Sequence, residues 1–418
     1  MAGSRRIPFA PFLAVALVAL VTFPAGAAAA PAARPTPPAG PVRLGFCGGD
    51  DWEPELAHQG SYVYVVITHY AGATACDPAS GAPNSIDIQV SSDGGRTFGP
   101  PTPVFTAPIG GVTYTRQADP VVAVDASGAV YVSYLGYGIN GGHTDVVVAK
   151  STDHGATFPT ATKANAKDCK NCDHEKLVVA GSSLYLAYSQ ASYHYLTMSS
   201  NGGATWSQAM VLSADRVAFA ESAVADAAGN VYVAWADCQS SNCTGVPAVT
   251  YRVSRTTAGT LSTTFAVVAY GAQGPNCPFQ SCGFAYFGAQ SDLAIDPAGT
   301  LYLLYQDGQV STVRGSPPIL WLARSSDAGA TWSGQVRADD KTASGCAASA
   351  CYALFPEVTA GAAGSVSVAW MDDRNGSPID HLNGWNVWLR SSTNGGASFG
   401  ASQQISAYDA AQAQSRPN

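Results

Sequence analysis

Five carboxylate or amide side chains recur in one short motif, Ser-x-Asp/Asn-x-Gly-x-Thr/Ser-aromatic, first seen as SSDGGRTF from Ser91 to Phe98. A carboxylate among glycines and hydroxyls could donate a proton, ligate a metal ion or accept the backbone N–H groups of a turn. An amide cannot act as a general acid, but it keeps the oxygen that accepts N–H bonds in an Asx-turn. The acid or amide of the five copies is Asp93, Asp153, Asn201, Asp327 and Asn394. The two asparagines therefore favour a structural turn over chemistry.

A second set of acids stands at the start of six recurring strand–turn–strand segments. These acids are Glu55, Glu175, Glu221, Asp292 and Glu357, with Asp119 one or two positions earlier in its segment. In a radial fold, such near-equivalent positions would form an acidic ring around the axis. The ring could hold Ca²⁺ through oxygen ligands, house a carboxyl with a raised pKa for acid–base chemistry, or line a wet channel. No cofactor is required by these residues.

Aromatic and charged residues collect near the same strand ends. Tyr114, Arg116 and Tyr352 precede first strands. The ends of second strands add His69, Tyr70, Tyr137, Asp237, Asp307, Asp372, Asp373 and Arg374. Rings that stack on pyranose faces and carboxylates that accept hydroxyl hydrogen bonds suit a sugar-binding funnel.

The elements that position these residues are short alternating strands. Each of the six segments reads as two strands around a tight turn, for example PVVAVDASGAVYVSY from Pro120 and ESAVADAAGNVYVAW from Glu221. A third alternating strand follows, then in five copies the acid/amide turn, then a short fourth strand. Four antiparallel strands leave one apolar face exposed, and six such sheets packed around an axis bury it. The sequence therefore predicts an all-β, six-bladed propeller of four-stranded antiparallel blades.

The repeated turn resembles the Asp boxes (bacterial neuraminidase repeats) of the sialidase superfamily. The resemblance covers nearly all of residues 47–406 and implies a sialidase-like propeller. In that family the Asp boxes lie on the face opposite the active site, so the resemblance directs the search for function to the other face.

The resemblance also implies site residues. Glu221 with Tyr352 would supply the nucleophile pair, Asp51 or Asp50 the acid/base, and Arg116, Arg314 and Arg374 the carboxylate clamp, with Tyr114 beside the substrate. The family's Phe/Tyr-Arg-Ile-Pro motif has no match after residue 30. The similar stretch RRIPF lies within the leader of residues 1–30. Two hypotheses follow: a glycan-directed protein, with hydrolysis of exo-α-sialidase type undecided, or a non-catalytic propeller that binds a glycan, a protein or the cell envelope.

Cysteines support the same choice of face. The ten cysteines of an exported chain imply up to five disulfides. Local spacing pairs Cys169 with Cys172, Cys238 with Cys243, Cys277 with Cys282 and Cys346 with Cys351, which leaves Cys47 and Cys76. All ten stand near first-strand starts or second-strand ends, where they would staple the loops or shield them from proteolysis. The alternative reading of CKNCDHEK as a metal site lacks a second ligand pair.

The chain ends and the charge complete the picture. Residues 1–30 read as a secretory signal peptide, residues 31–42 as a Pro/Ala-rich linker, residues 43–406 as the propeller and residues 407–418 as a polar tail. The formal net charge of -8 becomes more negative without Arg5 and Arg6, which disfavours nucleic acid as a partner. We expect a secreted, extracellular monomer without a membrane span, whose partner is a glycan or glycoconjugate.

Overall fold

The computed structural model describes most of the predicted propeller. The described residues are 43–46, 50–70, 84–105, 107–138, 144–165, 169, 172–190, 193–213, 217–238, 249–271, 290–308, 317–341, 352–375 and 385–406, with the backbone alone for 217–221 and 238. The predicted signal peptide, the linker and the C-terminal tail lie outside these ranges.

Six sheets of four strands follow one another along the chain, each in the antiparallel order first to fourth. Blade 1 is β1 (Asp50–Gln59), β2 (Tyr62–Tyr70), β3 (Asn84–Ser91) and β4 (Thr102–Pro103). Blade 2 is β5 (Tyr114–Val124), β6 (Val130–Gly138), β7 (Thr144–Ser151) and β8 (Thr160–Lys163). Blade 3 is β9 (Cys172–Ala180), β10 (Ser183–Gln190), β11 (Tyr193–Ser199) and β12 (Met210–Ser213).

The second half of the ring repeats the pattern. Blade 4 is β13 (Val217–Ala225), β14 (Val231–Cys238), β15 (Val249–Thr256) and β16 (Thr263–Gly271). Blade 5 is β17 (Ser291–Ile295), β18 (Leu301–Gly308), β19 (Pro318–Ser325) and β20 (Val336–Arg337). Blade 6 is β21 (Ala353–Ala360), β22 (Val366–Asp372), β23 (Asn386–Ser392) and β24 (Gln403–Gln404), with the short 3-10 helix η3 (Ala362–Gly364) in its first turn.

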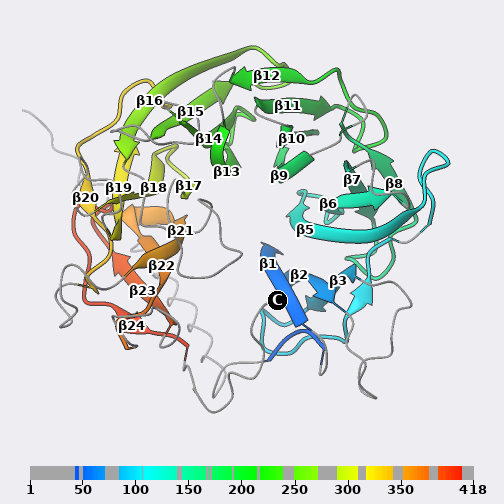
Figure 1. Ribbon diagram of the computed structural model, residues 1–418, viewed down its shortest axis with the longest axis horizontal. Coiled ribbons are helices and arrows are strands. Elements are labelled where there is room, and N and C mark those ends of the chain that lie inside the picture. Colours follow the sequence, from blue (N-terminus) through cyan, green and yellow to red (C-terminus); the bar gives the residue numbers. More distant parts are fainter. Residues whose placement is uncertain are drawn as a thin grey trace, which may run out of the picture. The chain divides into compact units, whose positions relative to one another are not determined.

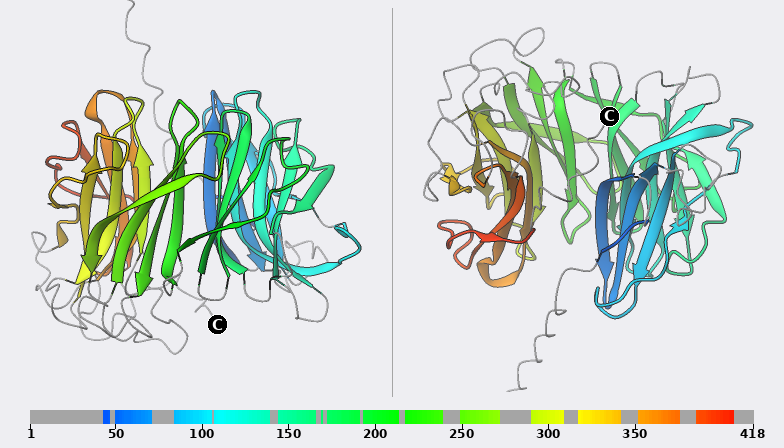
Figure 2. Two further views of the ribbon diagram at one scale, coloured as in Figure 1. Left: turned by 90° about the horizontal axis from the view of Figure 1, so that it is seen from above. Right: turned by 60° about the horizontal axis from the view of Figure 1, so that its bottom comes forward.

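The first strands of the blades surround a common centre, and the fourth strands lie outermost (Figure 1). Consecutive first strands are in contact from β1 through β5, β9, β13 and β17 to β21. Seen from the side, the strands run between two faces of the propeller (Figure 2). The predicted six-bladed, all-β propeller is confirmed. Among the described residues, no helix is long and apolar enough to cross a membrane.

Apolar side chains fill the spaces between successive blades. Second strands are buried along nearly their whole length because neighbours cover them on both faces, as in β18. Separate clusters join blades 1 and 2, 2 and 3, 3 and 4, 4 and 5, and 5 and 6. Within the described ranges no comparable cluster joins blade 6 to blade 1.

The acid/amide turns connect the third and fourth strands of five blades. In blade 1, Asp93 Oδ1 accepts the backbone N–H of Thr97 at 2.9 Å, and Ser91 Oγ accepts that of Gly95 at 2.9 Å. In blade 3, Asn201 Oδ1 accepts the N–H of Thr205 at the same 2.9 Å. The amide therefore makes the backbone bond that the acids make, as a structural turn requires.

The strand order places these turns on the face where the first and second strands connect. Gly94 N–H donates to Ser61 O at 2.8 Å, and Gly395 N–H donates to Gly364 O at 2.8 Å. The opposite face, which we call the upper face, carries the starts of first and third strands. The disulfide between Cys169 and Cys172 lies there, at the start of β9. The other four predicted pairs involve residues or side chains outside the described ranges.

We predict that the acid/amide turns make stability depend on acid pH. Hydrogen bonds from Ser151 and Thr157 lower the pKa of Asp153 to about 2, and those from Thr331 and Ser325 do the same for Asp327. A carboxyl whose folded pKa is lowered stabilises the fold above its unfolded pKa and loses that effect as pH falls. The melting temperature should therefore fall between about pH 4 and about pH 2.

The paired variants Asp153→Asn and Asp327→Asn give the control. Their combination should flatten the acid-side loss of melting temperature while leaving the neutral value nearly unchanged, because Asn201 and Asn394 already serve in two turns. The alanine counterparts should melt earlier at neutral pH. An unchanged acid-side slope in the asparagine double variant would contradict this account.

Candidate functional site

First strands are interrupted by a β-bulge at one equivalent point near the upper face. The register shifts between Trp52 and Glu55 in β1, between Ala118 and Val121 in β5, and at matching positions in β9, β13 and β21. The first bulge residue has a positive φ although it is not glycine, at Glu53 (52°), Asp119 (55°), His174 (53°) and Phe355 (52°). Such conformations are uncommon for these residue types and recur at functional sites. Bulges commonly re-aim a side chain.

The residue after each of these five bulges, together with Asp292 at the matching position of β17, lines a cavity of about 360 Å³ between the first strands. These six residues occupy equivalent positions in their blades. Each pairs with the matching residue of the second strand, as Val121 does with Ser133 and Lys176 with Ala187. They are Glu55, Val121, Lys176, Ser222, Asp292 and Glu357. We call this set the axial ring.

The axial ring differs from the acidic ring expected from sequence. Glu55, Asp292 and Glu357 belong to it as predicted, but Lys176 takes the place expected for Glu175. Asp119 stands two positions earlier, at the bulge itself. The side chain of Glu221 is outside the described set, and Ser222 lines the cavity in its blade.

Lys176 is the cation of the axial ring. Its Nζ donates to Glu55 Oε1 at 2.5 Å, which links blade 3 to blade 1 across the intervening blade 2. It lies deep in the propeller, yet 32% of its side-chain surface faces the cavity. Burial opposes the charge, but the carboxylate of Glu55 outweighs burial and raises the pKa of Lys176.

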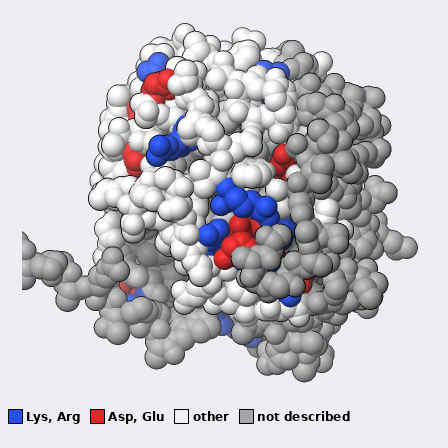
Figure 3. Space-filling view, turned by 90° about the vertical axis from the view of Figure 1, so that its left-hand side faces the viewer, with Lys and Arg blue, Asp and Glu red and all other residues white. Residues whose placement is uncertain are grey.

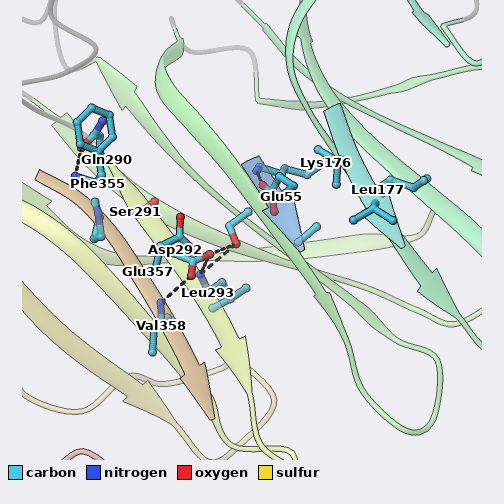
Figure 4. Close-up of a pocket in the computed structure, with 15 residues that line it drawn as sticks. Glu55, Lys176, Leu177, Gln290, Ser291, Asp292, Leu293, Phe355, Glu357 and Val358 are labelled. Carbon is cyan, nitrogen blue, oxygen red and sulfur yellow. Dashed lines mark hydrogen bonds and ion pairs between the residues drawn. The ribbon is translucent and has the colours of Figure 1, made fainter. Parts of the chain in front are cut away.

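Asp292 and Glu357 lie together, across the cavity from Lys176 and Glu55 (Figure 4). Asp292 accepts Ser222 Oγ–H at 2.6 Å and the N–H of Val358 at 2.8 Å. Burial raises the pKa of both carboxyls, and for Glu357 the adjacent charge of Asp292 adds to the effect. Two carboxyls in contact hold a proton more readily than one, so this pair retains protons that an exposed pair would lose.

A second group of carboxyls lies above the axial ring, at the upper face. Glu53 Oε2 accepts Thr68 Oγ1–H at 3.0 Å and the N–H of Asp119 at 3.1 Å, which joins blades 1 and 2. The carboxyl of Asp119 also meets the carboxyls of Glu53 and Asp173. Burial, together with these two acids, raises the pKa of Asp119 to about 9. Asp119 therefore carries a proton at neutral pH.

Glu175 adds a fourth acid to this group. Its side chain is 2% exposed, and neither carboxylate oxygen has a hydrogen-bond partner among the described residues. Burial raises its pKa well above the usual value, and the charges of Asp119 and Asp173 add to this. We call Glu53, Asp119, Asp173 and Glu175 the rim cluster.

Tyr137 and Arg116 border the rim cluster. Burial raises the pKa of Tyr137, and the charges of Asp119, Asp173 and Glu175 raise it further. The guanidinium of Arg116 lies 5.2 Å from the centre of the Tyr137 ring, and the Arg116 side chain is exposed. Arg116 is thus the predicted substrate-binding residue that the structure brings to the upper end of the axis. The side chain of Asp173 is 51% exposed, so solvent reaches the rim cluster.

Asp51 and Tyr114 occupy other parts of the upper face. Asp51 Oδ1 lies 2.8 Å from His69 Nδ1, and its other oxygen accepts the N–H of Phe46 at 2.9 Å. Tyr114 donates its hydroxyl to Asp145 Oδ2 at 2.8 Å, beside the Lys163–Asp145 ion pair. These contacts hold Asp51 in blade 1 and Tyr114 in blade 2. The roles predicted for them remain predictions.

Arg374 is buried in blade 6. Its side chain is 2% exposed, it pairs with Asp372 and Asp340, and its guanidinium lies 3.9 Å from the Trp388 ring. Its partner Asp340 also lies 3.8 Å from Arg390. Figure 3 shows basic and acidic side chains gathered on the side of the molecule that it views. Tyr352 is also buried, and its backbone N–H donates to Asp373 at 2.8 Å. Arg314 and the side chain of Glu221 lie outside the described set, so the clamp and the nucleophile pair are not assembled within it.

The described residues contain no group of three or more His, Cys, Asp or Glu side chains placed to hold a metal ion. Where the described chain encloses carboxylates most closely, in the axial ring, Lys176 supplies the positive charge. The expectation of Ca²⁺ near the axis gains no support from these residues.

Comparison with known proteins gives likeness in fold. No family model matches the sequence, and no curated protein matches it at a significant level. A family PL25 polysaccharide lyase, an ulvan lyase bound to -[GlcA(1-4)Rha3S]-, superposes with a TM-score of 0.54 and 12% identity over 86% of both chains. A Hadza microbial sialidase gives 0.43 and 12%, over 79% of this chain and 68% of its own. A Penicillium chrysogenum α-L-arabinanase complexed with arabinobiose gives 0.46 and 13%, over 81% and 92%.

Several site residues escaped the sequence argument. Glu53, Asp173 and Lys176 were hidden because the alternation of a strand is interrupted at the bulge, which moves each later residue to the other side. One signal was present: Pro54, Pro120 and Pro356 stand inside three first strands. Proline within a strand marks a bulge or an edge, so these prolines could have revealed the bulges of blades 1, 2 and 6, whereas blade 3 has Glu175 at this position and gives no such signal.

We predict that Lys176→Met makes stability strongly dependent on pH. A carboxyl with a raised folded pKa destabilises the fold as pH rises from its unfolded value towards its folded one. Without the ammonium, Glu55, Asp292 and Glu357 should hold protons more tightly, so the variant should be close to wild type near about pH 5 and clearly less stable near about pH 8. Urea unfolding across this range measures the slope.

Lys150→Met is the matched control, because Lys150 lies over the Tyr131 ring on an outer strand, away from the axis. Its stability should follow the wild-type pH profile. Parallel profiles for Lys176→Met and the wild type would show that Lys176 does not balance the axial carboxyls.

Proposed function

We propose that this protein is a secreted, glycan-directed glycoside hydrolase whose acid–base centre is the rim cluster. The observation that carries the proposal is the contact of the Asp119 carboxyl with those of Glu53 and Asp173 at an end of the axis that solvent reaches. Burial and these two acids raise the pKa of Asp119 to about 9. Neighbouring carboxyls whose environments push their pKa values apart are the usual basis of acid and base roles. The upper face is also the one that the sequence argument singled out.

The chemistry follows from the positions of the acids. Asp119 would donate its proton to the oxygen of the leaving sugar. Asp173 is the exposed acid next to it, and it would take a proton from water or face the positive charge that develops on the sugar ring. Glu53 is held by Thr68 and by the N–H of Asp119, so it would position the donor.

Aromatic side chains near the cluster suit a sugar ligand. Tyr70 is 37% exposed, and its ring meets that of Trp52 with centroids 6.2 Å apart. Tyr137 lies close to the same carboxyls and to Tyr70, with Arg116 over its ring. Rings of this kind stack on the apolar faces of sugars, while carboxyl and guanidinium groups bind hydroxyls.

An exo-α-sialidase is the less favoured form of the proposal. Sialidase chemistry of the kind the sequence resembles needs three guanidinium groups around the substrate carboxylate. Of the three arginines predicted for this role, Arg116 is exposed, Arg374 is buried with Asp372, and Arg314 lies outside the described residues. We therefore expect turnover of other glycosides rather than of sialosides. Secretion rests on the apolar leader within residues 1–30.

We predict that Asp119→Asn lowers kcat by about a hundredfold or more on any glycoside that the wild type cleaves, because the proton donor is lost. In the wild type, kcat/KM should fall as pH rises through about 9, where Asp119 loses its proton. A panel of aryl glycosides, sialosides included, provides the measurement. If Asp119 is the proton donor, the fall of kcat/KM at basic pH should disappear in Asp119→Asn.

Asp327→Asn serves as the control, because it removes one carboxylate from the opposite face and keeps the turn. It should retain wild-type rates. If no glycoside is cleaved by the wild type while glycans still bind, the protein is the non-catalytic binding propeller that the sequence left as the alternative.

A further inference from the structure

The outermost strand of blade 4 differs from those of the other five blades. β16 runs over nine residues, whereas β4, β8, β12, β20 and β24 have two to four each. Blade 4 is also the blade without the acid/amide turn between its third and fourth strands. A simple hairpin replaces that turn, with the Thr257 N–H donating to Ser262 O at 3.0 Å. β15 and β16 therefore pair along their whole length, beginning directly at this hairpin.

β16 is the free edge of its sheet. It is last in the strand order of blade 4, on the outside of the ring (Figure 1), and among the described residues no backbone hydrogen bond joins it to anything but β15. In an antiparallel pair, hydrogen-bonded and non-hydrogen-bonded residue pairs alternate. Since Thr257 is hydrogen-bonded to Ser262, this alternation directs the N–H and C=O groups of Thr263, Phe265 and Val267 away from β15. Such outward groups are a template for a further strand.

The exposed side chains of β16 form an apolar stripe. Phe265 is 60% exposed, Val267 42% and Tyr270 53%. They pair with three residues of β15 that stand two positions apart, so all three lie on one face of the sheet. The β-bulge at Val268 keeps Tyr270 on that face. Edge strands that avoid pairing are commonly short or carry charges or proline. β16 is long, uncharged and free of proline.

The chemistry of β16 fits a second copy of the same strand. The chain has 29 acidic against 21 basic residues, so two copies repel one another overall, but the uncharged β16 adds nothing to that repulsion. Antiparallel pairing about a two-fold axis is self-complementary. With Phe265 of both copies at the axis, Thr263 of one copy pairs with Val267 of the other. The three outward N–H and three outward C=O groups of each copy then all find partners, and the two Phe265 rings lie side by side.

The exposed area sets the strength of this contact. An aromatic side chain buries about 150–250 Å², so Phe265, Val267 and Tyr270 offer on the order of 300 Å² of apolar surface in each copy. Together with the paired backbones, the two stripes would bury about 1,000 Å², near the lower limit for a specific interface. The area therefore fits a weak, concentration-dependent dimer.

We propose that the protein forms a homodimer through antiparallel pairing of β16, which joins blade 4 of one copy to blade 4 of the other in one continuous sheet. The proposal departs from the monomer expected from the sequence. It does not depend on the proposed function, because β16 lies at the outside of the ring and the rim cluster at the axis.

Sedimentation velocity of the secreted protein measures the association. The wild type should be in monomer–dimer equilibrium with a Kd on the order of 10 μM, as a small interface allows. Phe265→Glu should raise the Kd more than about tenfold, because it removes the central ring pair and places two carboxylates opposite one another. Its melting temperature in dilute solution should stay at the wild-type value, since Phe265 is exposed and the guanidinium of Arg252 lies 5.9 Å from its ring.

Val211→Glu is the matched control, because Val211 is 49% exposed on β12, the four-residue outer strand of blade 3. It should dimerise as the wild type does. Amide hydrogen exchange gives an independent readout. Raising the protein concentration should slow exchange at Phe265 and Val267, whose N–H groups point outward, and should leave Thr264 and Ala266 unchanged because β15 already protects them.

Three results would overturn the proposal. The first is a wild type that stays monomeric up to about 200 μM, and the second is equal association of Phe265→Glu and the wild type. The third is a dimer in which the amides of Phe265 and Val267 exchange as fast as in the monomer, because the copies would then associate elsewhere. If a monomeric wild type gains protection at these amides only with an added extended peptide, the edge serves another protein and the second copy is the wrong occupant. None of these readouts needs a glycoside to be cleaved, so the hydrolase proposal stands or fails separately.

Discussion

The ion pair between Lys176 and Glu55 joins two blades that are not neighbours in the ring. Its partners come from β9 and β1, with Val121 of the blade between them leaving the cavity open. Five blade interfaces are filled by apolar clusters, and the described residues show no such cluster between blades 6 and 1. The ion pair between Lys176 and Glu55 adds a link between blades 3 and 1 through the axial cavity. Glu357 and Asp292 make the opposite wall of the cavity acidic. The single ammonium of Lys176 therefore balances carboxyls from blades 1, 5 and 6.

That arrangement depends on the bulges in the first strands. In a regular strand successive side chains point to opposite sides, and the residue inserted at a bulge resets this alternation for the residues after it. The bulge adds a residue and re-aims the chain at the point where the strands approach the axis. The positive φ of Glu53, Asp119 and Phe355 is a local cost that the surrounding sheet must hold in place. The N–H of Asp119 is one such restraint, since it donates to Glu53 across the blade boundary.

Much of the fold could be predicted because its determinants are local. Alternating apolar residues and turn chemistry specify strands and hairpins, and their sixfold repetition specifies the ring. The site was less accessible. Glu55, Asp292 and Glu357 were placed correctly because each is an acid at the start of its strand–turn–strand segment, whereas Lys176 directly follows the acid Glu175, which was chosen in its place. Glu53 required knowledge of the bulge. Arg374 illustrates a second limit: its position after a second strand was read correctly, but its burial with Asp372 and Asp340 depends on packing between distant segments. Exposure of a long side chain cannot be read from its place in a repeat.

The repeated fold and the unrepeated site make different demands on the same positions. Turn positions hold Asp or Asn with little variation because each blade must solve the same backbone problem. The bulge positions hold Glu53, Asp119, His174 and Phe355, which share a conformation but little chemistry. The acids of the rim cluster come from blades 1, 2 and 3, next to the exposed Arg116 and the half-buried Tyr137. In blade 6 the first bulge residue is Phe355, which carries an apolar side chain. If the bulges served the ring only, proline would suffice after each of them, as it does in three blades. Glu175 in blade 3 stands where three other blades have proline, so the backbone of the bulge does not by itself require an acid there.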